Sequence, residues 1–492
     1  MEAVAVYSDA DVGAMHVAMA DSAVHLGPAA PAESYLRIDR IIQAALATGS
    51  QAIHPGYGFL AERAAFARAA EAAGVVFVGP SSDAIDALGD KLHARRLASS
   101  IGVDPVPGSL DPAPVDRPDA AARIVEEAEA IGFPLFVKAA AGGGGRGMRR
   151  VTDSRDLPAA LSAASAEALA AFGDGSVYLE REILPARHIE VQLLGDSTGR
   201  VVALGERDCS LQRRHQKLVE EAPAPGLTTD ERRSLHDQAV RIATAAGLQN
   251  AATAEFLRSP DGAFHFLEVN TRLQVEHGVT ELVTGLDIVH EQFRLAAGEP
   301  LSAAVLAAAA RAAIPNGHAV EVRLTAEDPS RDFAPTPGTL RRWVMPSGPG
   351  VRVDTGLADG DRIPNEYDNL LAKIMVYGPD RDTALDRLVR ALDETRIAGV
   401  QTTLPFHRWV ARDPSFRAGD LSTDWVGEHW DGPSQRGIVA ERAAQLAGLA
   451  VLAGGVLAGS RPGSGDGRGP TSAHANGWLA AAHDDAMDRW PR

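Results

Sequence analysis

A run of alternating polar side chains in LEVNTRLQVEH (267–277) is the strongest chemical signal in this sequence. An extended segment would project five polar residues from one face at i, i+2 spacing: Glu268, Asn270, Arg272, Gln274 and Glu276. A solvated strand face also alternates in this way. Here, however, every polar side chain is long or amide-bearing, and the charges run minus, neutral, plus, neutral, minus, which favours a binding site for charged ligands.

A second carboxylate is expected opposite this segment. Residues 253–270 are typical of a β-hairpin with a Ser-Pro-Asp-Gly turn at 259–262. Counting back from the turn places Glu255 within a residue or two of the position that faces Glu268, and a bulge would change this register. Two neighbouring carboxylates repel unless one is protonated or a cation lies between them. Oxygen ligands favour Mg²⁺ or Mn²⁺, so we predict a metal site here.

The stretch KAAAGGGGRGM (138–148) contains a glycine run that no packed core requires. Three of its glycines fit G-x-G-x-x-G, but MRRVT (148–152) then reads as a strand, whereas a dinucleotide fingerprint requires a helix. A P-loop is excluded because the chain contains no Gly-Lys-Ser/Thr tripeptide. Two interpretations remain: a surface hairpin, or a flap whose backbone N–H groups close over phosphates beside Lys138.

A third cluster, ERDCSLQRRHQKLVEEAPAP (206–225), is rich in hydrogen-bond donors: Arg207, Arg213, Arg214, His215 and Lys217. It is too short for a nucleic-acid surface and runs directly into two glutamates, so we interpret it as an anion clamp. Cys209 lies within it and is expected to be a small buried side chain rather than a nucleophile.

With HPGYGFLAE (54–62) and GHAVEVRLTAEDP (317–329), these motifs resemble the biotin carboxylase subunit or domain of biotin-dependent acyl-CoA carboxylases of the acetyl- or propionyl-CoA carboxylase alpha-chain type. The resemblance runs from residue 1 to about 430 and implies an ATP-grasp fold. It also implies carboxylation of biotin N1 with ATP and bicarbonate, through carboxyphosphate. Two alternatives stay open: another ATP-grasp carboxylating ligase, which QRRHQK and RLQVEH disfavour, and a catalytically impaired nucleotide-binding subunit.

The resemblance implies a role for each matching residue. The catalytic residues would be Arg272, Glu276 (the base), Lys217 and Arg323, which would stabilise the biotin enolate. Bicarbonate would be held by Lys217, Arg272, Gln274, Val275 and Glu276, and two metal ions by Glu255, Glu268 and Asn270. ATP would be bound by Lys91, Lys138, Gly142, Gly143, Gly144, Gly145, Gly147, Glu180, Arg181, Ile183, His188, Gln212 and His215, with the glycines as a closing lid.

The resemblance also implies partners. No AMKM biotin-attachment motif occurs, so biotin is expected in trans, on a biotin carboxyl carrier protein or domain. The other expected partners are a second copy of this chain and a carboxyltransferase subunit. Two departures from the family pattern stand out. The strand–helix unit that usually precedes the strand at 4–8 is missing, and Gly278 replaces a proline after the base, which we expect to loosen that loop.

Composition sets the remaining limits. The chain has 492 residues, a formal net charge of −17 and a single cysteine, which indicates a cytoplasmic protein that binds neither nucleic acid nor anionic membranes. The N-terminus has no basic region followed by an apolar one, so no secretory signal is expected. The apolar run at 448–459 is too short and too glycine-rich to span a bilayer.

The elements that must position these residues alternate. Strands are expected at 4–8, 23–26, 52–56 and 75–79, with helices at 33–49 and 60–74, which predicts a doubly wound parallel sheet in an α/β protein that is α+β in parts. Further strands are expected at 133–141, 177–184 and 188–196, and helices at 154–172 and 381–396. The expected domains are an N-terminal domain (1–88), an ATP-grasp domain (89–297) with its lid at about 110–182, a C-terminal mixed domain (315–425) and an Ala/Gly/Pro-rich tail and linker (430–492).

Overall fold

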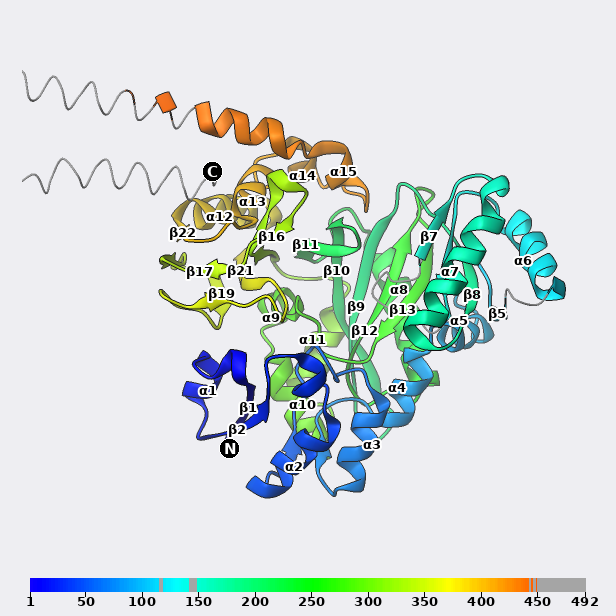
Figure 1. The fold of residues 1–492 in the computed structure, drawn as a ribbon, viewed down its shortest axis with the longest axis horizontal. Helices are drawn as coiled ribbons and strands as arrows, with labels where there is room; N and C mark the ends of the chain where they lie inside the picture. The colour runs from blue at the N-terminus through cyan, green and yellow to red at the C-terminus, as the bar shows by residue number, and fades with distance from the viewer. Residues whose placement is uncertain (115–117, 141–147, 442–443, 446–447, 449–492) are drawn as a thin grey trace, which may run out of the picture.

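An eight-stranded antiparallel sheet forms the centre of the molecule, in the order β13-β12-β9-β10-β11-β14-β21-β19. The structure is a computed structural model that describes residues 1–114, 118–140, 148–441, 444–445 and 448 (Figure 1). The strands are β9 (Arg187–Gly195), β10 (Val201–Arg213), β11 (Gln216–Ala222), β12 (Asn250–Arg258), β13 (Phe264–Asn270), β14 (His318–Thr325), β19 (Val351–Thr355) and β21 (Leu370–Gly378). The expected flap glycines, Gly142–Gly145 and Gly147, and the expected linker at 459–477 lie outside the described residues.

Helices cover both faces of this sheet, so its central strands are buried on both sides. On one face, α5 (Lys91–Ser100) and α8 (Thr229–Ala245) pack against Ile189, Val191 and Leu193 of β9. On the other face, α10 (Ile288–Ala296) and α11 (Ala303–Arg311) pack against Leu194. The side chains of β9 alternate between these two cores, as the two-residue period of a strand requires. The polar residues of β9 therefore share the second face with Leu194.

A smaller sheet, in the order β5-β8-β6-β7, stands at one side of the central sheet (Figure 1). Its elements are β5 (Ala113–Pro114), α6 (Pro118–Ile131), β6 (Leu135–Ala139), β7 (Met148–Val151), α7 (Leu157–Phe172) and β8 (Ser176–Arg181). The strand predicted after the glycine run is confirmed by β7, which pairs antiparallel with β6. This pairing leaves no helix there, so the dinucleotide-binding interpretation stays excluded.

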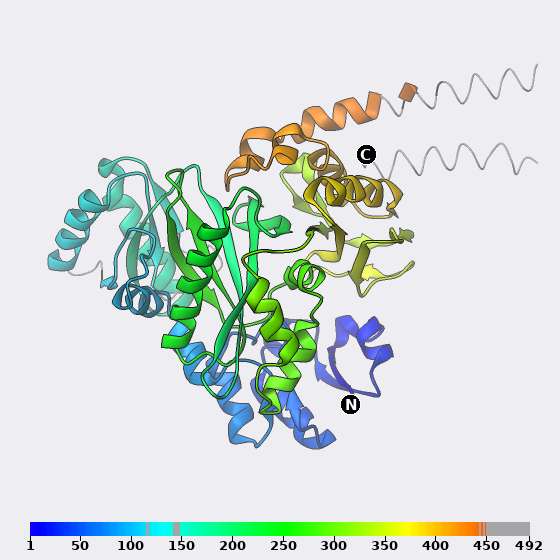
Figure 2. The ribbon, with the colours of Figure 1, turned by 180° about the vertical axis from the view of Figure 1, so that it is seen from behind.

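The N-terminal elements lie below the C-terminal part in both views (Figures 1 and 2). They are β1 (Val4–Ser8), α1 (Met15–Met19), β2 (Ser22–Gly27), α2 (Ile38–Thr48), β3 (Ala52–Ile53), α3 (Ala64–Ala72), β4 (Val76–Phe77) and α4 (Ser82–Gly89). The strands are parallel, as predicted, but β1–β2 and β3–β4 form two separate pairs instead of one continuous sheet. Tyr367 joins this region to the C-terminal part, because its hydroxyl donates to Ala29 O at 2.6 Å.

The C-terminal elements continue the central sheet. They are α12 (Arg381–Glu394), α13 (Leu404–Val410), α14 (Pro414–Ala418), α15 (Trp425–His429) and the short strands β15 (Glu327–Asp328), β16 (Ala334–Pro335), β17 (Gly338–Thr339), β18 (Arg342–Val344), β20 (Arg362–Ile363) and β22 (Arg396–Ala398). The helix predicted at 381–396 is confirmed by α12, which packs against β21. Because β14 pairs with β11, the strands that lie between residues 187 and 378 in β9–β14, β19 and β21 form one continuous sheet. Residues 432–441, at the start of the expected Ala/Gly/Pro-rich tail and linker (430–492), are helical.

Candidate active site

Lys217 lies at the centre of a buried group of carboxylates. It enters from β11, and its Nζ contacts Glu190 Oε2 at 2.5 Å, Glu276 Oε1 at 2.7 Å and Glu255 Oε1 at 2.9 Å. Burial alone would lower the pKa of Lys217, but the three negative charges outweigh it and hold this pKa well above its ordinary value. The lysine is therefore a permanent cation that joins residues expected to act on bicarbonate and on metal.

Glu276 is fully buried between two cations. Lys217 Nζ contacts one of its carboxylate oxygens, and Arg323 Nη2 lies 3.0 Å from the other. Burial would raise the pKa of Glu276, but Lys217, Arg323 and Arg207 together hold it well below the ordinary value. Glu276 is therefore ionised at neutral pH, which is the form that a general base requires.

Two members of this cluster were missed or misplaced by the sequence interpretation. Glu190 was not predicted, although it is fully buried and joins Lys217 to Arg207, whose Nε donates to Glu190 Oε1 at 2.5 Å. Arg207 was expected in the anion clamp, but it is also fully buried and donates to Gln192 and Thr280, both at 2.9 Å. Its guanidinium donors are already used by these protein partners, so Arg207 positions Glu190 and its neighbours instead of binding an anion.

The predicted pairing of two carboxylates across a hairpin is confirmed. Glu255 of β12 faces Glu268 of β13, with a register shift directly after Glu255. Glu255 Oε1 also accepts from Asn270 Nδ2 at 2.9 Å, and Glu268 Oε2 lies 2.5 Å from Lys91 Nζ. Burial would raise the pKa of Glu255, but Lys217 and His188 lower it below the ordinary value.

These oxygen donors fit Mg²⁺. The set formed by Glu255, Glu268 and Asn270 contains only carboxylate and amide oxygens, which suit a hard divalent cation. In the described part of the chain, Glu255 also converges with His188 and Glu190, their ligand atoms lying within 4.8 Å of one another. Cys209 lies close by but is fully buried, and burial raises the pKa of its thiol well above the ordinary value. The prediction of a small buried cysteine is thus confirmed, and no thiolate is available to select a softer metal.

The extended strand predicted for 267–277 is wrong beyond Asn270. The strand β13 ends there, residues 271–276 are irregular, and Glu276 precedes α9 (His277–Thr284) as its N-cap residue. The polar side chains nevertheless converge through specific contacts. Arg272 donates to Gln274 Oε1 at 2.9 Å and to Asn270 Oδ1 at 3.2 Å, while its Nε donates to Glu62 Oε2 at 2.9 Å. Glu62 had no predicted role, although it closes the quoted motif HPGYGFLAE.

The smaller sheet brings Lys138 and Glu180 together. Lys138 on β6 contacts Glu180 on the neighbouring strand β8, and Arg95 Nη1 lies 3.3 Å from the same carboxylate. Burial would raise the pKa of Glu180, but the charges of Lys138 and Arg95 hold it below the ordinary value. Arg181, the next residue along β8, is exposed and donates to Ile131 O at 3.0 Å, away from Glu180.

The remaining residues expected to bind ATP come from β9, β10, the turn that follows β10 and the segment after β8. His188 Nε2 lies 3.0 Å from Glu255 Oε2, outside hydrogen-bonding alignment, and His188 Nδ1 is 3.5 Å from Gln212 Nε2. His215 is exposed in the β10–β11 turn with φ +63°, and its ring lies 6.3 Å from that of Phe136 on β6. Ile183 is half-buried, two residues after the end of β8. His215 and Phe136 thus bridge the two sheets.

Two arginines of the expected anion clamp have a protein partner instead. Arg213 and Arg214 both pair with Asp332, and the Arg213 guanidinium lies over the Phe333 ring at 4.7 Å. The pKa of Asp332 is lowered by this pairing. Of the five donors in the predicted clamp, Lys217 and His215 therefore remain near the site, while three arginines serve the fold.

Arg323 lies between the base and two further buried carboxylates. Its Nε donates to Glu220 Oε1 at 2.6 Å, and Glu220 faces Glu321 across the β11–β14 pairing. Burial is the main cause that raises the pKa of Glu220 to about 7, against the opposing charge of Arg323. Burial likewise raises the pKa of Glu321 well above its ordinary value, and neither of its oxygens has a hydrogen-bond partner among the described residues. Burial therefore favours the protonated form of Glu321.

Gly278 was expected to loosen the segment after the base, but the structure shows it closely packed. It lies buried in the first turn of α9, packed against Met375 of β21. A Cβ atom at this position would lie 2.3 Å from Met375 Sδ. The neighbouring Val275 O accepts from Lys373 Nζ at 2.8 Å, which fixes the backbone on the other side of Glu276. The glycine therefore allows close packing.

Three family models cover most of the chain. They are the biotin carboxylase N-terminal domain (residues 1–85), the carbamoyl-phosphate synthase L chain ATP-binding domain (90–304) and the biotin carboxylase C-terminal domain (321–428). The chain is 46% identical over 441 residues to a pyruvate carboxylase subunit of Methanothermobacter thermautotrophicus, covering 90% of this chain and 87% of that protein. It is also 46% identical to the biotin carboxylase of a Nostoc species, covering 86% of this chain and 93% of that protein. The chain is a member of the biotin carboxylase family.

Solved structures agree with this assignment. A Campylobacter jejuni biotin carboxylase complex matches with a TM-score of 0.82 at 41% identity, covering 87% of this chain and 93% of that one. The biotin carboxylase domain dimer of a Hydrogenobacter thermophilus 2-oxoglutarate carboxylase, in complex with MgADP, ADP and bicarbonate, matches with a TM-score of 0.81 at 42% identity, covering 87% and 92%. The predicted ATP-grasp fold and family are thus confirmed. Within the described residues, no helix is long and apolar enough to cross a bilayer.

Proposed function

We propose that this chain uses ATP and bicarbonate to carboxylate N1 of biotin carried on another protein, as the biotin carboxylase component of an acyl-CoA carboxylase. The observation that carries the proposal is the position of Glu276, buried and ionised between Lys217 and Arg323. A base held between two cations suits an anionic substrate that must lose a proton. Lys217 and Arg272 would hold bicarbonate while Glu276 takes its proton and the freed oxygen attacks the γ-phosphorus of ATP.

The resulting carboxyphosphate would break down to CO₂ and phosphate beside biotin. The phosphate would take the N1 proton of biotin, Arg323 would stabilise the enolate so formed, and N1 would attack the CO₂. Glu255, Glu268 and Asn270 would hold Mg²⁺, which would neutralise charge on the transferring phosphoryl group, and Mn²⁺ would be able to replace it. Lys91, Lys138 and His215 would contact the nucleotide phosphates, with the segment at 141–147 as the proposed lid. Glu180 and the backbone through Ile183 would receive the adenine, beside His188 and Gln212. The Arg181 side chain faces away and would contribute through its backbone.

We further propose the domain division 1–88, 89–297, 315–425 and 430–492, with a biotin carrier, a carboxyltransferase and a second copy of this chain as partners in the cytoplasm. Relatives named as a propionyl-CoA carboxylase alpha chain and an acyl-CoA carboxylase alpha3 subunit support partners of this kind. A solved relative described as a domain dimer supports the second copy.

ATP hydrolysis measured with and without bicarbonate, and with and without free biotin, tests the activity. A biotin carboxylase should cleave ATP only when bicarbonate is present, faster with biotin, and should transfer labelled bicarbonate to biotin. Glu276→Gln, which keeps the size and removes the base, should lose both products. ATP binding without bicarbonate-dependent hydrolysis would instead indicate an impaired nucleotide-binding subunit. Bicarbonate-dependent hydrolysis without carboxybiotin would indicate another ATP-grasp ligase.

A further inference from the structure

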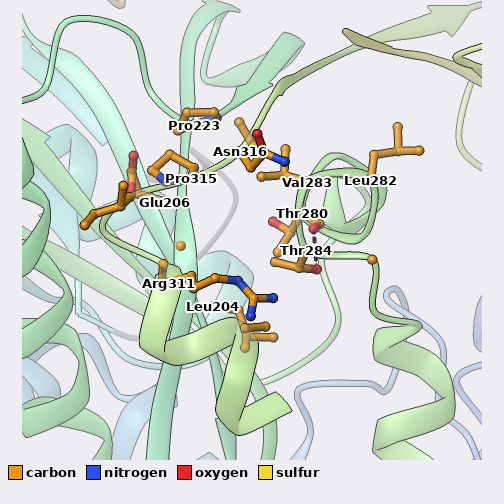
Figure 3. Close-up of a pocket in the computed structure, with 16 residues that line it drawn as sticks. Leu204, Glu206, Pro223, Thr280, Leu282, Val283, Thr284, Arg311, Pro315 and Asn316 are labelled. Carbon is orange, nitrogen blue, oxygen red and sulfur yellow. Dashed lines mark hydrogen bonds between the residues drawn. The ribbon is translucent and has the colours of Figure 1, made fainter. Parts of the chain in front are cut away.

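A second cavity lies at the far end of helix α9 from the active site. It has a volume of about 300 Å³ and is enclosed by the C-terminal half of α9, the end of α11, the loop 312–316 and the middle of β10 (Figure 3). We call it the α9–α11 pocket. Glu276 lies at the start of α9 and Thr284 at its end, about 12 Å along an eight-residue helix. None of the residues assigned to ATP, bicarbonate, metal or biotin lines this pocket.

The guanidinium of Arg311 points into the α9–α11 pocket. Arg311 is in the last turn of α11 and extends toward Thr280 and Thr284 (Figure 3). In the part of the chain that the structure describes, its side chain makes no hydrogen bond or ion pair, whereas its backbone carbonyl accepts from Ile314 N at 2.8 Å. An arginine in the last turn of a helix also interacts favourably with the helix dipole when its charge lies near the C-terminal carbonyls. Arg311 is exposed, so its donors lie at the mouth of the pocket, where they are available both to solvent and to a ligand.

The other charge in the pocket wall is already neutralised. Both carboxylate oxygens of Glu206 are occupied, by Arg232 Nε at 2.7 Å and by His236 Nε2 at 2.8 Å. Thr284 Oγ1 is also occupied, because it donates to Thr280 O at 2.7 Å. Among the described residues that line it, the pocket therefore carries the single positive charge of Arg311, which selects an anion as the polar part of a ligand.

Two helix ends limit the charge of that anion. Gly285, the C-cap of α9, and Ala312, the C-cap of α11, both line the pocket. The C-terminal ends of helices carry partial negative charge and disfavour anions. The positive charge of Arg311 can outweigh the repulsion from the helix ends for an anion with one negative charge. An anion with two negative charges would be repelled about twice as strongly, and the described lining residues contain no second cation to offset this. A carboxylate is therefore favoured over a phosphate.

The rest of the wall is apolar. Leu204, Val283, Ala308 and Pro315 contribute hydrocarbon, and Ile314 at the rim is 66% exposed. A volume of about 300 Å³ lies at the lower end of ligand pockets, so only a short apolar body fits. We propose that the α9–α11 pocket binds a small organic monocarboxylate, with the carboxylate on Arg311 and a short aliphatic chain against Val283 and Leu204. The proposal is independent of the catalytic assignment.

Three probes with the same chain and different head groups test the proposal: hexanoate, 1-hexanol and hexyl phosphate. Calorimetric titration should give saturable one-to-one binding of hexanoate, with at least tenfold weaker binding of the other two. Arg311→Gln should weaken hexanoate to the level of hexanol and leave hexanol unchanged, whereas Arg311→Lys should retain part of the difference. Arg68→Gln, an exposed arginine on α3, is the matched control and should bind hexanoate normally. Methyl resonances of Val283 and Ile314 should shift with hexanoate.

The proposal fails if hexanoate does not saturate the wild-type protein, or if Arg311→Gln binds it as well as wild type does. It also fails if hexyl phosphate binds as tightly as hexanoate, or if the shifted resonances belong to another region. Arg311 contacts no assigned catalytic residue among those the structure describes, so Arg311→Gln without hexanoate should keep wild-type, bicarbonate-dependent ATP cleavage. That assay separates a failure of the pocket from a failure of the proposed function.

Discussion

Replacing Arg323 by alanine should separate the two halves of the proposed reaction, although less cleanly than their positions in the sequence suggest. Arg323 and Glu276 are 47 residues apart in the chain, yet their side chains are 3.0 Å apart. The substitution therefore acts on the base as well as on the biotin enolate. The size of the effect on ATP cleavage depends on the contacts that Glu276 and Glu220, the two carboxylate partners of Arg323, retain when the arginine is removed.

Glu276 keeps its contact with Lys217 at 2.7 Å. Losing one of its cationic neighbours should raise its pKa by about 1–3 units. Because that pKa starts well below the ordinary value, Glu276 stays ionised at neutral pH and can still accept a proton. Glu220 loses its hydrogen-bond partner, but with a pKa of about 7 it can become protonated at little cost near neutral pH. Bicarbonate-dependent ATP cleavage should therefore fall by no more than about tenfold.

In the biotin step, no residue other than Arg323 is assigned to stabilise the enolate. Removing a preorganised donor from a developing oxyanion typically costs about 10²–10³ in rate, or about 3–4 kcal/mol. Carboxybiotin formation by Arg323→Ala should therefore fall at least tenfold more than ATP cleavage. Phosphate release and transfer of labelled bicarbonate to biotin, followed in parallel, measure the two steps, with Arg323→Lys as the charge-retaining control. Equal losses in both assays, with an intact fold by circular dichroism, would refute the division and place Arg323 in the bicarbonate site.

Four other substitutions have defined outcomes. Glu255→Gln and Glu268→Gln should each raise the Mg²⁺ concentration needed for ATP cleavage, since each removes a charged oxygen ligand; unchanged Mg²⁺ titrations in both variants would contradict the metal assignment. Gly278→Ala should lower the free energy of unfolding by no more than about 1 kcal/mol, because the flexible Met375 side chain can shift and alanine favours the helix, and it should not lower it in a Met375→Ala background; equal losses by chemical denaturation in both backgrounds would exclude the Met375 contact as the cause. Glu221 is buried, which would raise its pKa, but His318 and Arg381 lower that pKa from 4.5 to about 2, so Glu221 contributes about 3 kcal/mol above pH 4.5 that is lost as the pH falls toward 2. Glu221→Gln should lack this part of the acid dependence of unfolding, and parallel stability curves for variant and wild type would contradict the assignment.

The sequence was sufficient where a turn fixed the register. The Ser-Pro-Asp-Gly turn set the pairing of β12 with β13, so the meeting of Glu255 and Glu268 could be predicted by counting. The strand after the glycine run was predictable for a similar reason, because its composition matches a short strand. Both features depend on residues that are close in the chain.

The alternating segment shows why local pattern is not always enough. Alternation continues from Glu268 to Glu276, yet the strand ends at Asn270. Beyond that point the backbone follows long-range contacts, because Arg272 is held by Glu62, 210 residues away. A two-residue period cannot distinguish a strand from an irregular segment whose polar residues each have a distant partner.

Glu190 and Arg207 were missed as a pair for a related reason. Glu190 lies between Ile189 and Val191 in β9, where an isolated charge requires a partner of opposite sign, so a search for unpaired charges in apolar strands would have found it. Arg207 is flanked by Glu206 and Asp208 in β10, so the sequence suggested local partners and gave no sign that it is buried against Glu190. Their partnership was not readable, because it depends on the β9–β10 register, which places Arg207 directly opposite Glu190 after a bulge.

The charged residues around Glu276 share ion-pair partners, so the protonation of each one depends on the others. Lys217 contacts both Glu255 and Glu276, which are expected to serve metal binding and proton transfer, and Arg323 contacts both Glu276 and Glu220, which has no assigned step. In a buried site, a charge added to one member changes the proton affinity of all the others, because little water is present to screen it. Bicarbonate would add a negative charge to this group, and Glu220, with a pKa of about 7, is the member best placed to offset it by taking up a proton. Arg323, relieved of that ion pair, would then be freer to face the biotin enolate.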